Sequence, residues 1–402
     1  MVNVLHTADW HYNDKDHDEI AKCVDALICE AKIALPDIIV ISGDITNSQN
    51  LKLDTLSSRT IFRQVSELAN IAPVCIIIGT HSHDGRSAEI LEYVKGRYQV
   101  HVSSRPEQLF LINKHLYPVD GVPPGEKVTA IITQVPTPTK EHFSMDGSIA
   151  KTDAEVSEVL GYILGSFGVI ASQYDCPHIL SGHFQVRGSS ISETQQLVGR
   201  DIEVSEDQLA RANATVICLG HIHMAQQIKH NIFYSGSIYR KDFGELEEKG
   251  FYLHGLEKAR AEVWDLKESR FVLVPTRVLE KWEDDFTGKA ISPIGEDKDV
   301  KGKHIKIDLK LWQDERPQVD PQKMEEALLQ RGAESVDIHF TLVPRETVRA
   351  VTIIEAVSLL DKFRSMSELR EEELPAGVID KIKMLESMNP EEVVAEVGGR
   401  VG

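Results

Sequence analysis

Aspartate and histidine side chains that suit metal binding recur at the ends of short apolar runs in this chain. Six of them stand in the order Asp9, His11, Asp44, His183, His221 and His223. Carboxylates and neutral imidazoles are ligands for manganese, iron and zinc, and a carboxylate such as Asp44 can bridge two ions. A single buried histidine is more often a core residue than a ligand. The ordered series, with each member at a strand end, predicts a site for two divalent cations.

The elements that must position these residues alternate between strands and helices. Apolar runs at 2–5, 37–42 and 74–78 predict strands, and apolar residues spaced by three or four predict helices at 18–34 and about 54–69. This order indicates an α/β layered fold with a partly parallel sheet. Ligands of open α/β sheets lie beyond the carboxyl ends of the strands. The six residues are therefore expected to converge in one crevice.

The remainder of the chain predicts more strands and a change of organisation. Further strands are expected at 128–134, 178–181, 215–219, 232–235, 250–255, 305–311 and 335–343. Helices are expected near 152–171 and at 321–332, 347–363 and 376–388. The polar stretch at 283–302 contains glycine and proline and is typical of a linker or loop. We therefore expect a large domain at 1–280, a small α+β domain at 281–345 and a helical segment at 346–402.

The composition restricts how the protein could act on a polyanion. The 402 residues include 63 acidic and 44 basic side chains, which gives a formal net charge of −19. A protein that held nucleic acid mainly through its own surface would be basic, so bound cations or a partner subunit must supply positive charge. Five scattered cysteines without CxxC spacing indicate reduced thiols. Without a signal-like N-terminus or an apolar run near 18 residues, we expect a cytoplasmic protein that does not enter a membrane.

The order DxH, GD, G-x-H, GH and GHxH resembles that of the calcineurin-like metallophosphoesterases, and specifically of the SbcD-type DNA double-strand-break repair nucleases. The segment YSGSIYRKDFGE at 234–245, followed by Lys249-Gly250-Phe251, is similar to the stretch after GHxH in those nucleases. The resemblance covers about residues 1–275 with specific motifs. It covers more loosely the order of nuclease core, capping domain and helical tail. It implies a layered β-sandwich flanked by helices, a capping (DNA-binding) domain at 281–345 and an ATPase-binding segment at 346–402.

The resemblance also divides the ligands between two cations. The first set that it implies is Asp9, His11 and His223. The second set is His183 and His221, and Asp44 bridges the two ions. Histidine ligands in a mixed nitrogen and oxygen shell favour manganese, whereas magnesium prefers oxygen and is expected to be less effective.

The segment at 79–84 departs from the family, whose members usually carry G-N-H-D where this chain reads G-T-H-S-H-D. If no residue is inserted, Thr80 replaces the metal-binding Asn and His81 is the catalytic histidine. If two residues are inserted, Ser82 takes the Asn position and His83 is catalytic, beside Asp84. The second alignment is preferred because it keeps a His-Asp pair that can orient the imidazole. In both alignments a hydroxyl replaces an amide oxygen, so weaker binding of the second ion is expected.

The function implied by the resemblance is that of a manganese-dependent phosphodiesterase, a DNA exonuclease and endonuclease of a prokaryotic cell or its virus. Its partners would be DNA and an SbcC-like coiled-coil ABC-type ATPase, which docks on the C-terminal helices. A homodimer is also expected. Candidates for contacts with the substrate phosphates are Arg86, Arg187 and Arg240.

Two other functions fit the same residues. One is a phosphodiesterase or phosphatase for small substrates on the same scaffold. The other is a catalytically weakened scaffold subunit whose metal site has decayed at 80–82. Metal content and activity on duplex DNA distinguish the three.

Overall fold

The chain, seen in a computed structural model, divides into two compact units. One comprises Met1–Trp282, Lys298–Lys306 and Glu325–Asp337, and the other comprises Glu283–Asp297, Ile307–Met324 and Ile338–Gly402. The structure describes residues 1–122, 125–139, 153–192, 195, 202–259, 263–287, 295, 297–344, 358–370 and 373–389.

Six strands form the first sheet. Their order is β15 (Trp264–Leu273), β14 (Gly250–Lys258), β1 (Val2–Thr7), β2 (Ile38–Ile41), β3 (Val74–Ile77) and β4 (Val100–Ser103). The four strands from β1 to β4 are parallel, whereas β14 pairs antiparallel with both β1 and β15. The strands predicted at 2–5, 37–42 and 74–78 are confirmed, and they lie in the parallel part of this sheet.

Seven strands form the second sheet. Their order is β12 (Gln226–Lys229), β13 (Ile232–Tyr234), β11 (Val216–Gly220), β8 (His178–His183), β7 (Ala130–Val135), β5 (Glu107–Ile112) and β6 (His115–Pro118). The central strands β13, β11, β8 and β7 are parallel, and the edges are antiparallel. Two short strands, β9 (Gln185–Val186) and β10 (Glu203–Val204), pair with each other. Both large sheets are therefore mixed.

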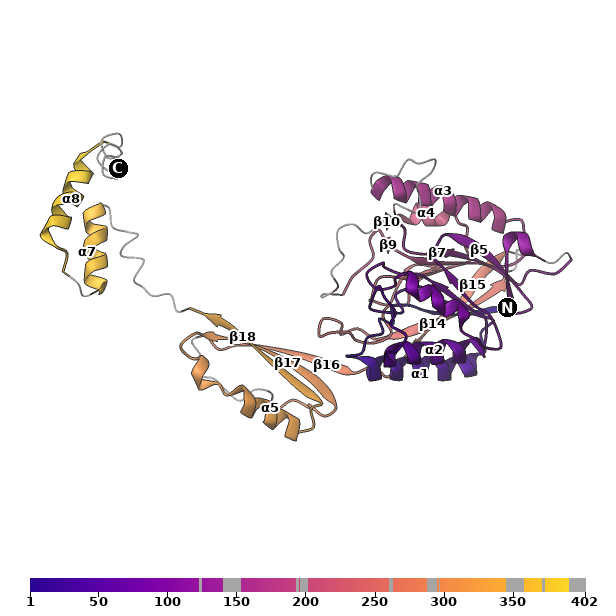
Figure 1. Ribbon diagram of the computed structural model, residues 1–402, viewed down its shortest axis with the longest axis horizontal. Helices are drawn as coiled ribbons and strands as arrows, with labels where there is room; N and C mark the ends of the chain where they lie inside the picture. The colour runs from indigo at the N-terminus through magenta and orange to yellow at the C-terminus, as the bar shows by residue number, and fades with distance from the viewer. Residues whose placement is uncertain are drawn as a thin grey trace. The chain divides into compact units, whose positions relative to one another are not determined.

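Helices cover the outer faces of the two sheets, as Figure 1 shows. They are α1 (His17–Ala34), α2 (Leu56–Ala69), α3 (Asp153–Ala171) and α4 (Glu206–Ala210), and short 3-10 helices lie at η1 (Arg86–Tyr93), η2 (Val119–Gly121) and η3 (Arg316–Gln318). Leu27 and Val65 of α1 and α2 are buried against the first sheet, and Leu160 and Leu209 of α3 and α4 against the second. A third apolar cluster contains residues from both sheets, among them Val4, Val40, Ile179 and Cys218. The result is an α/β fold of four layers, in which two sheets pack together between two layers of helices. This is the layered architecture expected.

Helix α3 differs from the expectation that no long apolar segment is present. Its segment Ala154–Ala171 is long and apolar enough to cross a membrane by length and composition, with a mean hydropathy of 1.4 and 33% of it buried. Core helices share this length and composition. Val156, Leu160 and Leu164 lie in the apolar cluster that α3 forms with the second sheet and α4. This packing accounts for the apolar residues on that face of α3.

The later part of the chain forms a small sheet and helices. The sheet has the order β16 (Val278–Asp285), β17 (Lys303–Trp312) and β18 (Ser335–Val343), and the helices are α5 (Pro321–Gln330), α7 (Leu359–Arg370) and α8 (Ala376–Ser387). The strands predicted at 305–311 and 335–343 and the helix predicted at 321–332 are confirmed.

The prediction of a helix at 347–363 is wrong at its C-terminal end, because α7 continues to Arg370. Residues 347–357 of the predicted span lie outside the described part of the chain. The hydroxyl of Ser358 accepts a hydrogen bond from the backbone N–H of Asp361 at 3.0 Å. This is an N-cap, which explains why α7 begins at Leu359.

Candidate metal centre

The six predicted ligands stand at the carboxyl ends of four parallel strands. In the first sheet Asp9 and His11 follow β1 and Asp44 follows β2, and in the second sheet His183 ends β8 while His221 and His223 follow β11. The backbone N–H of His221 donates to both carboxylate oxygens of Asp9 at 3.1 Å. The two sheets therefore meet at this edge, which brings the predicted ligands near one another.

Four of these ligands have a left-handed backbone. The φ angles are +53° at Asp9, +48° at His11, +53° at Asp44 and +91° at His221. Such angles are uncommon outside glycine and cost of order 1–3 kcal/mol each, so they persist where surrounding contacts impose them. Here the N–H of Asp9 donates to the carbonyl of Gly43 at 3.0 Å, and that of His11 to the carbonyl of Asp44 at 2.9 Å. These bonds hold the loops after β1 and β2 side by side.

The imidazoles of His11 and His223 face each other through their Nε2 atoms, which lie 2.9 Å apart. Nδ1 of His223 donates to a carboxylate oxygen of Glu245 at 2.6 Å, so in the neutral ring Nε2 carries the lone pair. Nε2 of His11 also lies 4.0 Å from Asp9 and 3.8 Å from Asp44. A hydrogen bond on the far nitrogen is the usual arrangement for a histidine that binds a metal ion.

The carboxylate of Asp44 is at the middle of a second set of contacts. One oxygen accepts a hydrogen bond from the backbone N–H of Thr80 at 2.6 Å. The other lies 3.4 Å from Nε2 of His183, while Nδ1 of His183 donates to the carbonyl of Ser42 at 2.7 Å. The hydroxyl of Thr80 is 3.2 Å from the same Nε2. Asp44, His183 and Thr80 thus place three potential ligand atoms close together.

The ligand atoms form three overlapping groups, within each of which all atoms lie within 4.8 Å of one another. The groups are Asp9-His11-His223, Asp9-Asp44-His183 and His11-Asp44-His83. Asp9 and Asp44 each belong to two groups, so the geometry allows either carboxylate to bridge two ions. All members except His83 are buried.

The buried carboxylates of the cluster favour a bound positive charge. Burial raises the pKa of Asp9 well above its ordinary value. Burial opposes the ionisation of Asp44 too, but His183 outweighs it and holds the pKa of Asp44 well below its usual range. The pKa of His183, which burial alone would lower, is raised to about 9 by the charge of Asp44. The raised pKa of Asp9 and the positive charge of His183 beside Asp44 both reduce the negative charge of the two buried carboxylates, and a divalent cation would supply the same compensation.

These residues fit a centre of two divalent cations. The donor set consists of carboxylates and imidazoles, the ligands that manganese, iron and zinc accept. Buried Nδ1 of His11 has no hydrogen-bond partner among the described residues, while its Nε2 faces the cluster. The sequence profile of calcineurin-like phosphoesterases matches residues 2–225, which contain all six ligands.

The chain belongs to the calcineurin-like phosphoesterase family.

One relative of known name matches a longer part of the chain. The protein is 26% identical over 296 residues to the SbcD component of the nuclease SbcCD from Staphylococcus saprophyticus subsp. saprophyticus, with 71% of this chain and 72% of that protein covered. Two solved structures show weaker similarity. GAP50, described as the anchor in the inner membrane complex of Plasmodium, matches with a TM-score of 0.41 at 13% identity, covering 68% of this chain and 89% of that one. A dimetal phosphatase from Danio rerio matches with a TM-score of 0.40 at 11% identity, covering 68% and 99%.

The segment that departs from the phosphoesterase pattern combines features of both alignments. Thr80 lies beside Asp44 and His183, whereas Ser82 is exposed in the turn at 81–83. The preferred placement of Ser82 at the metal is therefore corrected in favour of Thr80. His83 donates from Nδ1 to Asp44 at 2.8 Å, while His81 is exposed. The two-residue insertion thus forms a turn that brings His83 back to the cluster.

Asp84 does not orient the imidazole of His83 as expected. Its carboxylate accepts three backbone hydrogen bonds, from Ile45 at 3.1 Å, Thr46 at 2.9 Å and Gly79 at 3.2 Å. Burial and the charge of Asp44 raise the pKa of Asp84 to about 6. Asp84 therefore ties the loop after β3 to the loop after β2.

His221 lies near the cluster without joining its three groups, with its ring centroid 5.3 Å from that of His183. Its backbone carbonyl accepts a hydrogen bond from the side chain of Gln195 at 2.6 Å. The same side chain accepts one from the N–H of His223 at 3.0 Å. Gln195 therefore bridges the two residues of the GHxH motif.

Two of the three arginines expected at the substrate are engaged elsewhere. The guanidinium of Arg240 donates to the backbone carbonyls of Leu246, Glu247 and Arg277 at 2.9–3.2 Å. It holds loops of the protein together, which corrects its predicted role. Arg187 is 70% exposed and pairs with Glu203 at 3.2 Å. Arg86 instead lines a pocket of about 350 Å³ with Gly79, His81, Asp84 and Thr137. This pocket adjoins the metal centre through Gly79, whose neighbour Thr80 binds Asp44.

The residues that support His223 are not among the predicted site residues. Lys249 is fully buried and its ammonium lies 3.0 Å from Glu245, 2.8 Å from Glu247 and 2.7 Å from the hydroxyl of Ser237. Burial opposes the ionisation of Glu245, but the hydrogen bond from His223 and the charge of Lys249 lower its pKa to about 2. The sequence did contain a pointer to them, because Glu245 and Lys249 belong to the stretch after GHxH that resembles the nucleases.

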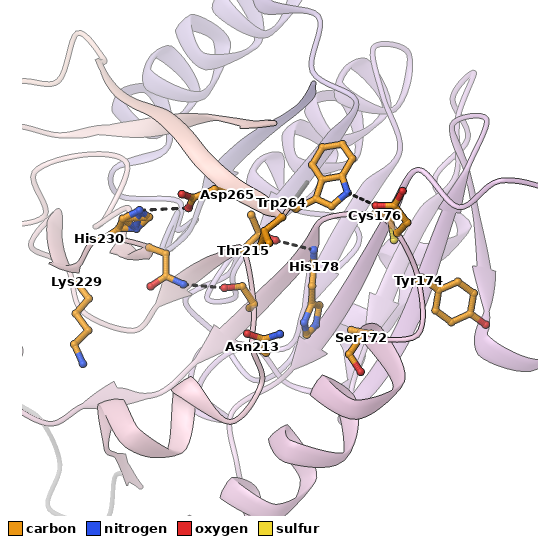
Figure 2. Close-up of a pocket in the computed structure, with 15 residues that line it drawn as sticks. Ser172, Tyr174, Cys176, His178, Asn213, Thr215, Lys229, His230, Trp264 and Asp265 are labelled. Carbon is orange, nitrogen blue, oxygen red and sulfur yellow. Dashed lines mark hydrogen bonds and ion pairs between the residues drawn. The ribbon is translucent and has the colours of Figure 1, made fainter. Parts of the chain in front are cut away.

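A second hollow, of about 680 Å³, lies at the amino ends of β8 and β11 (Figure 2). His178 at the amino end of β8 lines it, whereas His183 at the carboxyl end of β8 belongs to the metal centre. Its polar side chains pair with one another, as His230 does with Asp265 at 3.4 Å and Trp264 with Asp175 at 3.3 Å. None of the predicted site residues lines it. Ligands of parallel sheets bind at carboxyl ends, so the catalytic chemistry belongs to the metal centre.

Proposed function

We propose that this phosphoesterase is a DNA nuclease subunit that cleaves phosphodiester bonds with two divalent cations. The observation that carries the proposal is the buried cluster of Asp9, His11, Asp44, His183 and His223. The relative that is named a nuclease subunit supports DNA as the substrate. Its alignment covers 71% of the chain, which is more than the segment 2–225 that the phosphoesterase profile matches. The negative charge of the chain fits a protein whose cations supply the local positive charge.

The ligands divide between the two cations as the contacts suggest. Asp9, His11 and His223 would hold one ion. Asp44 and His183 would hold the other with the hydroxyl of Thr80, and His221 lies beside them. Cations at this site would supply polarisation of a phosphodiester oxygen and activation of a water nucleophile near neutral pH.

The protein's own residues then position and protonate the substrate. Asp44 fixes the ring of His83 through Nδ1, so Nε2 is the atom that can protonate the departing oxygen. Arg86 and His81 line the adjoining pocket and would contact the phosphate or sugar next to the scissile bond. Imidazole ligands favour manganese over magnesium at this site.

The test is cleavage of linear duplex DNA beside a chromogenic phosphodiester, with manganese present. We expect the wild-type protein to degrade duplex DNA and His223→Ala to lose this activity by about 100-fold or more. His230→Ala is the control, because His230 lies at the second hollow. Cleavage of the small phosphodiester without cleavage of DNA would instead identify an enzyme for small substrates. Loss of neither activity in His223→Ala would remove the cluster from the mechanism.

We also propose that α7 and α8 bind an ATPase partner of the SbcC type. The two helices contact each other, since Glu386 accepts a hydrogen bond from the N–H of Leu360 at 3.1 Å. Their exposed apolar side chains are Leu359, Phe363 and Met384. An amphipathic helix can lay such residues into a groove of a partner. Phe363→Glu should abolish complex formation with the ATPase, whereas Lys362→Glu should not; binding by both variants alike would contradict this docking.

A further inference from the structure

A second cluster of potential metal ligands lies outside the residues assigned to the metal centre. It consists of His6 on β1, Cys218 on β11 and His254 on β14. Their ligand atoms lie within 4.8 Å of one another, and all three residues are at most 1% exposed. β1 and β14 are neighbours in the first sheet, and β11 belongs to the second. The cluster therefore lies between the sheets, in the layer that contains Val4 and Cys218.

Two imidazole nitrogens in this cluster lack hydrogen-bond partners among the described residues. Nε2 of His6 donates to the carbonyl of Leu219 at 3.1 Å, so Nδ1 carries the lone pair of the neutral ring and is unpaired. Nδ1 of His254 bonds to the hydroxyl of Ser269 at 2.7 Å, and its Nε2 is unpaired. A buried polar atom without a partner is costly and calls for an explanation.

The protonation state of the two imidazoles suits ligation. Burial lowers the pKa of His6 to about 3 and that of His254 well below its ordinary value, so both rings are neutral. Burial raises the pKa of the Cys218 thiol, so a cation must displace the thiol proton when it binds. The two rings are stacked, with centroids 5.7 Å apart and planes inclined by 27°, and do not hydrogen-bond to each other. Both unpaired nitrogens and the sulfur are therefore left for a shared ligand.

We propose that His6, Cys218 and His254 bind one thiophilic d10 cation, Zn²⁺ or Cu⁺, which links the two sheets. One sulfur and two imidazole nitrogens form a soft donor set. The cluster contains no carboxylate, so it differs in chemistry from the Asp/His metal centre. On binding, the Cys218 thiol gives its proton to solvent and a metal–thiolate bond forms. The site is independent of the proposed nuclease activity.

Cobalt(II) provides a direct test, because a thiolate ligand gives cobalt an intense near-ultraviolet charge-transfer band. The Asp/His centre has no sulfur and cannot produce it. The full chain is expressed in cobalt-supplemented minimal medium, so that the metal enters as the chain folds. Wild type and Cys75→Ser should show the band, and Cys218→Ser should lack it. Cys75 is a matched control because it is buried in the same apolar cluster.

Absence of the band in wild type, or its persistence in Cys218→Ser, would overturn the proposal. Far-ultraviolet circular dichroism verifies that each variant is folded. Elemental analysis then identifies the natural ion. Wild type grown with zinc and copper and dialysed against excess manganese should retain one equivalent of zinc or of copper more than Cys218→Ser. Equal zinc and equal copper in the two proteins would also overturn it.

Discussion

The carboxylate of Glu245 accepts a hydrogen bond from Nδ1 of His223 at 2.6 Å, and this bond leaves Nε2 of His223 facing Nε2 of His11. It fixes both the orientation and the tautomer of a ligand that follows β11. The hydrogen bond from His223 and the charge of Lys249 keep Glu245 ionised in a buried position. The ligand set of the metal centre thus depends on a second layer of charged residues in the segment 245–249.

Glu245→Gln should weaken manganese binding by about 10–100-fold, the usual effect of removing such a supporting carboxylate. The amide cannot act as an ionised acceptor for His223. Calorimetric titration of the folded variant measures the affinity. Glu247→Gln is the matched control, since Glu247 also pairs with Lys249 but is not bonded to His223. Wild-type affinity in Glu245→Gln would show that this contact does not support the site.

His83→Ala should reduce kcat on a phosphodiester by about 10²–10⁴-fold, the range for loss of a general acid. The bound manganese should change little, because the assigned ligands remain. His81→Ala, at an exposed position of the same turn, should affect KM more than kcat. Steady-state kinetics with both variants distinguish the two histidines. A larger loss of kcat in His81→Ala would reverse the assignment.

Gly79→Ala should disrupt the metal centre, because a Cβ at this position would overlap the carboxylate and the backbone nitrogen of Asp44. The variant is expected to melt at a lower temperature and to bind less manganese. Gly165→Ala in α3 is the control, because its added Cβ would meet only the side chain of Arg211 at 3.8 Å. Normal manganese binding by Gly79→Ala would mean that Asp44 can move without loss of the site.

The large unit and the position of its site could be predicted from the sequence because both follow from local patterns. Residues 38–41 are apolar without interruption because β2 is covered on both faces, and Asp44 follows where the strand ends. The support of His223 by Glu245 depends on a loop that folds back, which no periodicity encodes. The positions of Thr80, Ser82 and His83 depend on a turn whose path is set by contacts with Asp44.

His178 should make the stability of the protein depend on pH. Burial lowers its pKa to about 4 from the ordinary value of 6.5, so the folded state keeps the ring neutral. The unfolded chain takes up a proton as the pH falls below 6.5. The contribution of neutral His178 to the free energy of unfolding is therefore fully present above pH 6.5. It is lost as the pH falls toward 4, by about 1.4 kcal/mol per pH unit.

Urea unfolding at about pH 7 and at about pH 5 tests this dependence. His178→Gln should lose less stability than wild type as the pH falls, since glutamine takes up no proton. His115→Gln is the control because His115 is exposed at β6, where water reaches it in both states. If the free energy of unfolding fell equally with pH in wild type and His178→Gln, His178 would be excluded as a source of the pH dependence.

The most direct test of the central claim is manganese-dependent cleavage of linear duplex DNA by wild type and by Asp44→Asn. Asp44 contacts His183, His83 and Thr80 and belongs to two ligand groups, so it connects every part of the proposed centre. We predict cleavage by wild type and a loss of about 100-fold or more in Asp44→Asn. Cleavage by Asp44→Asn at the wild-type rate would contradict the account.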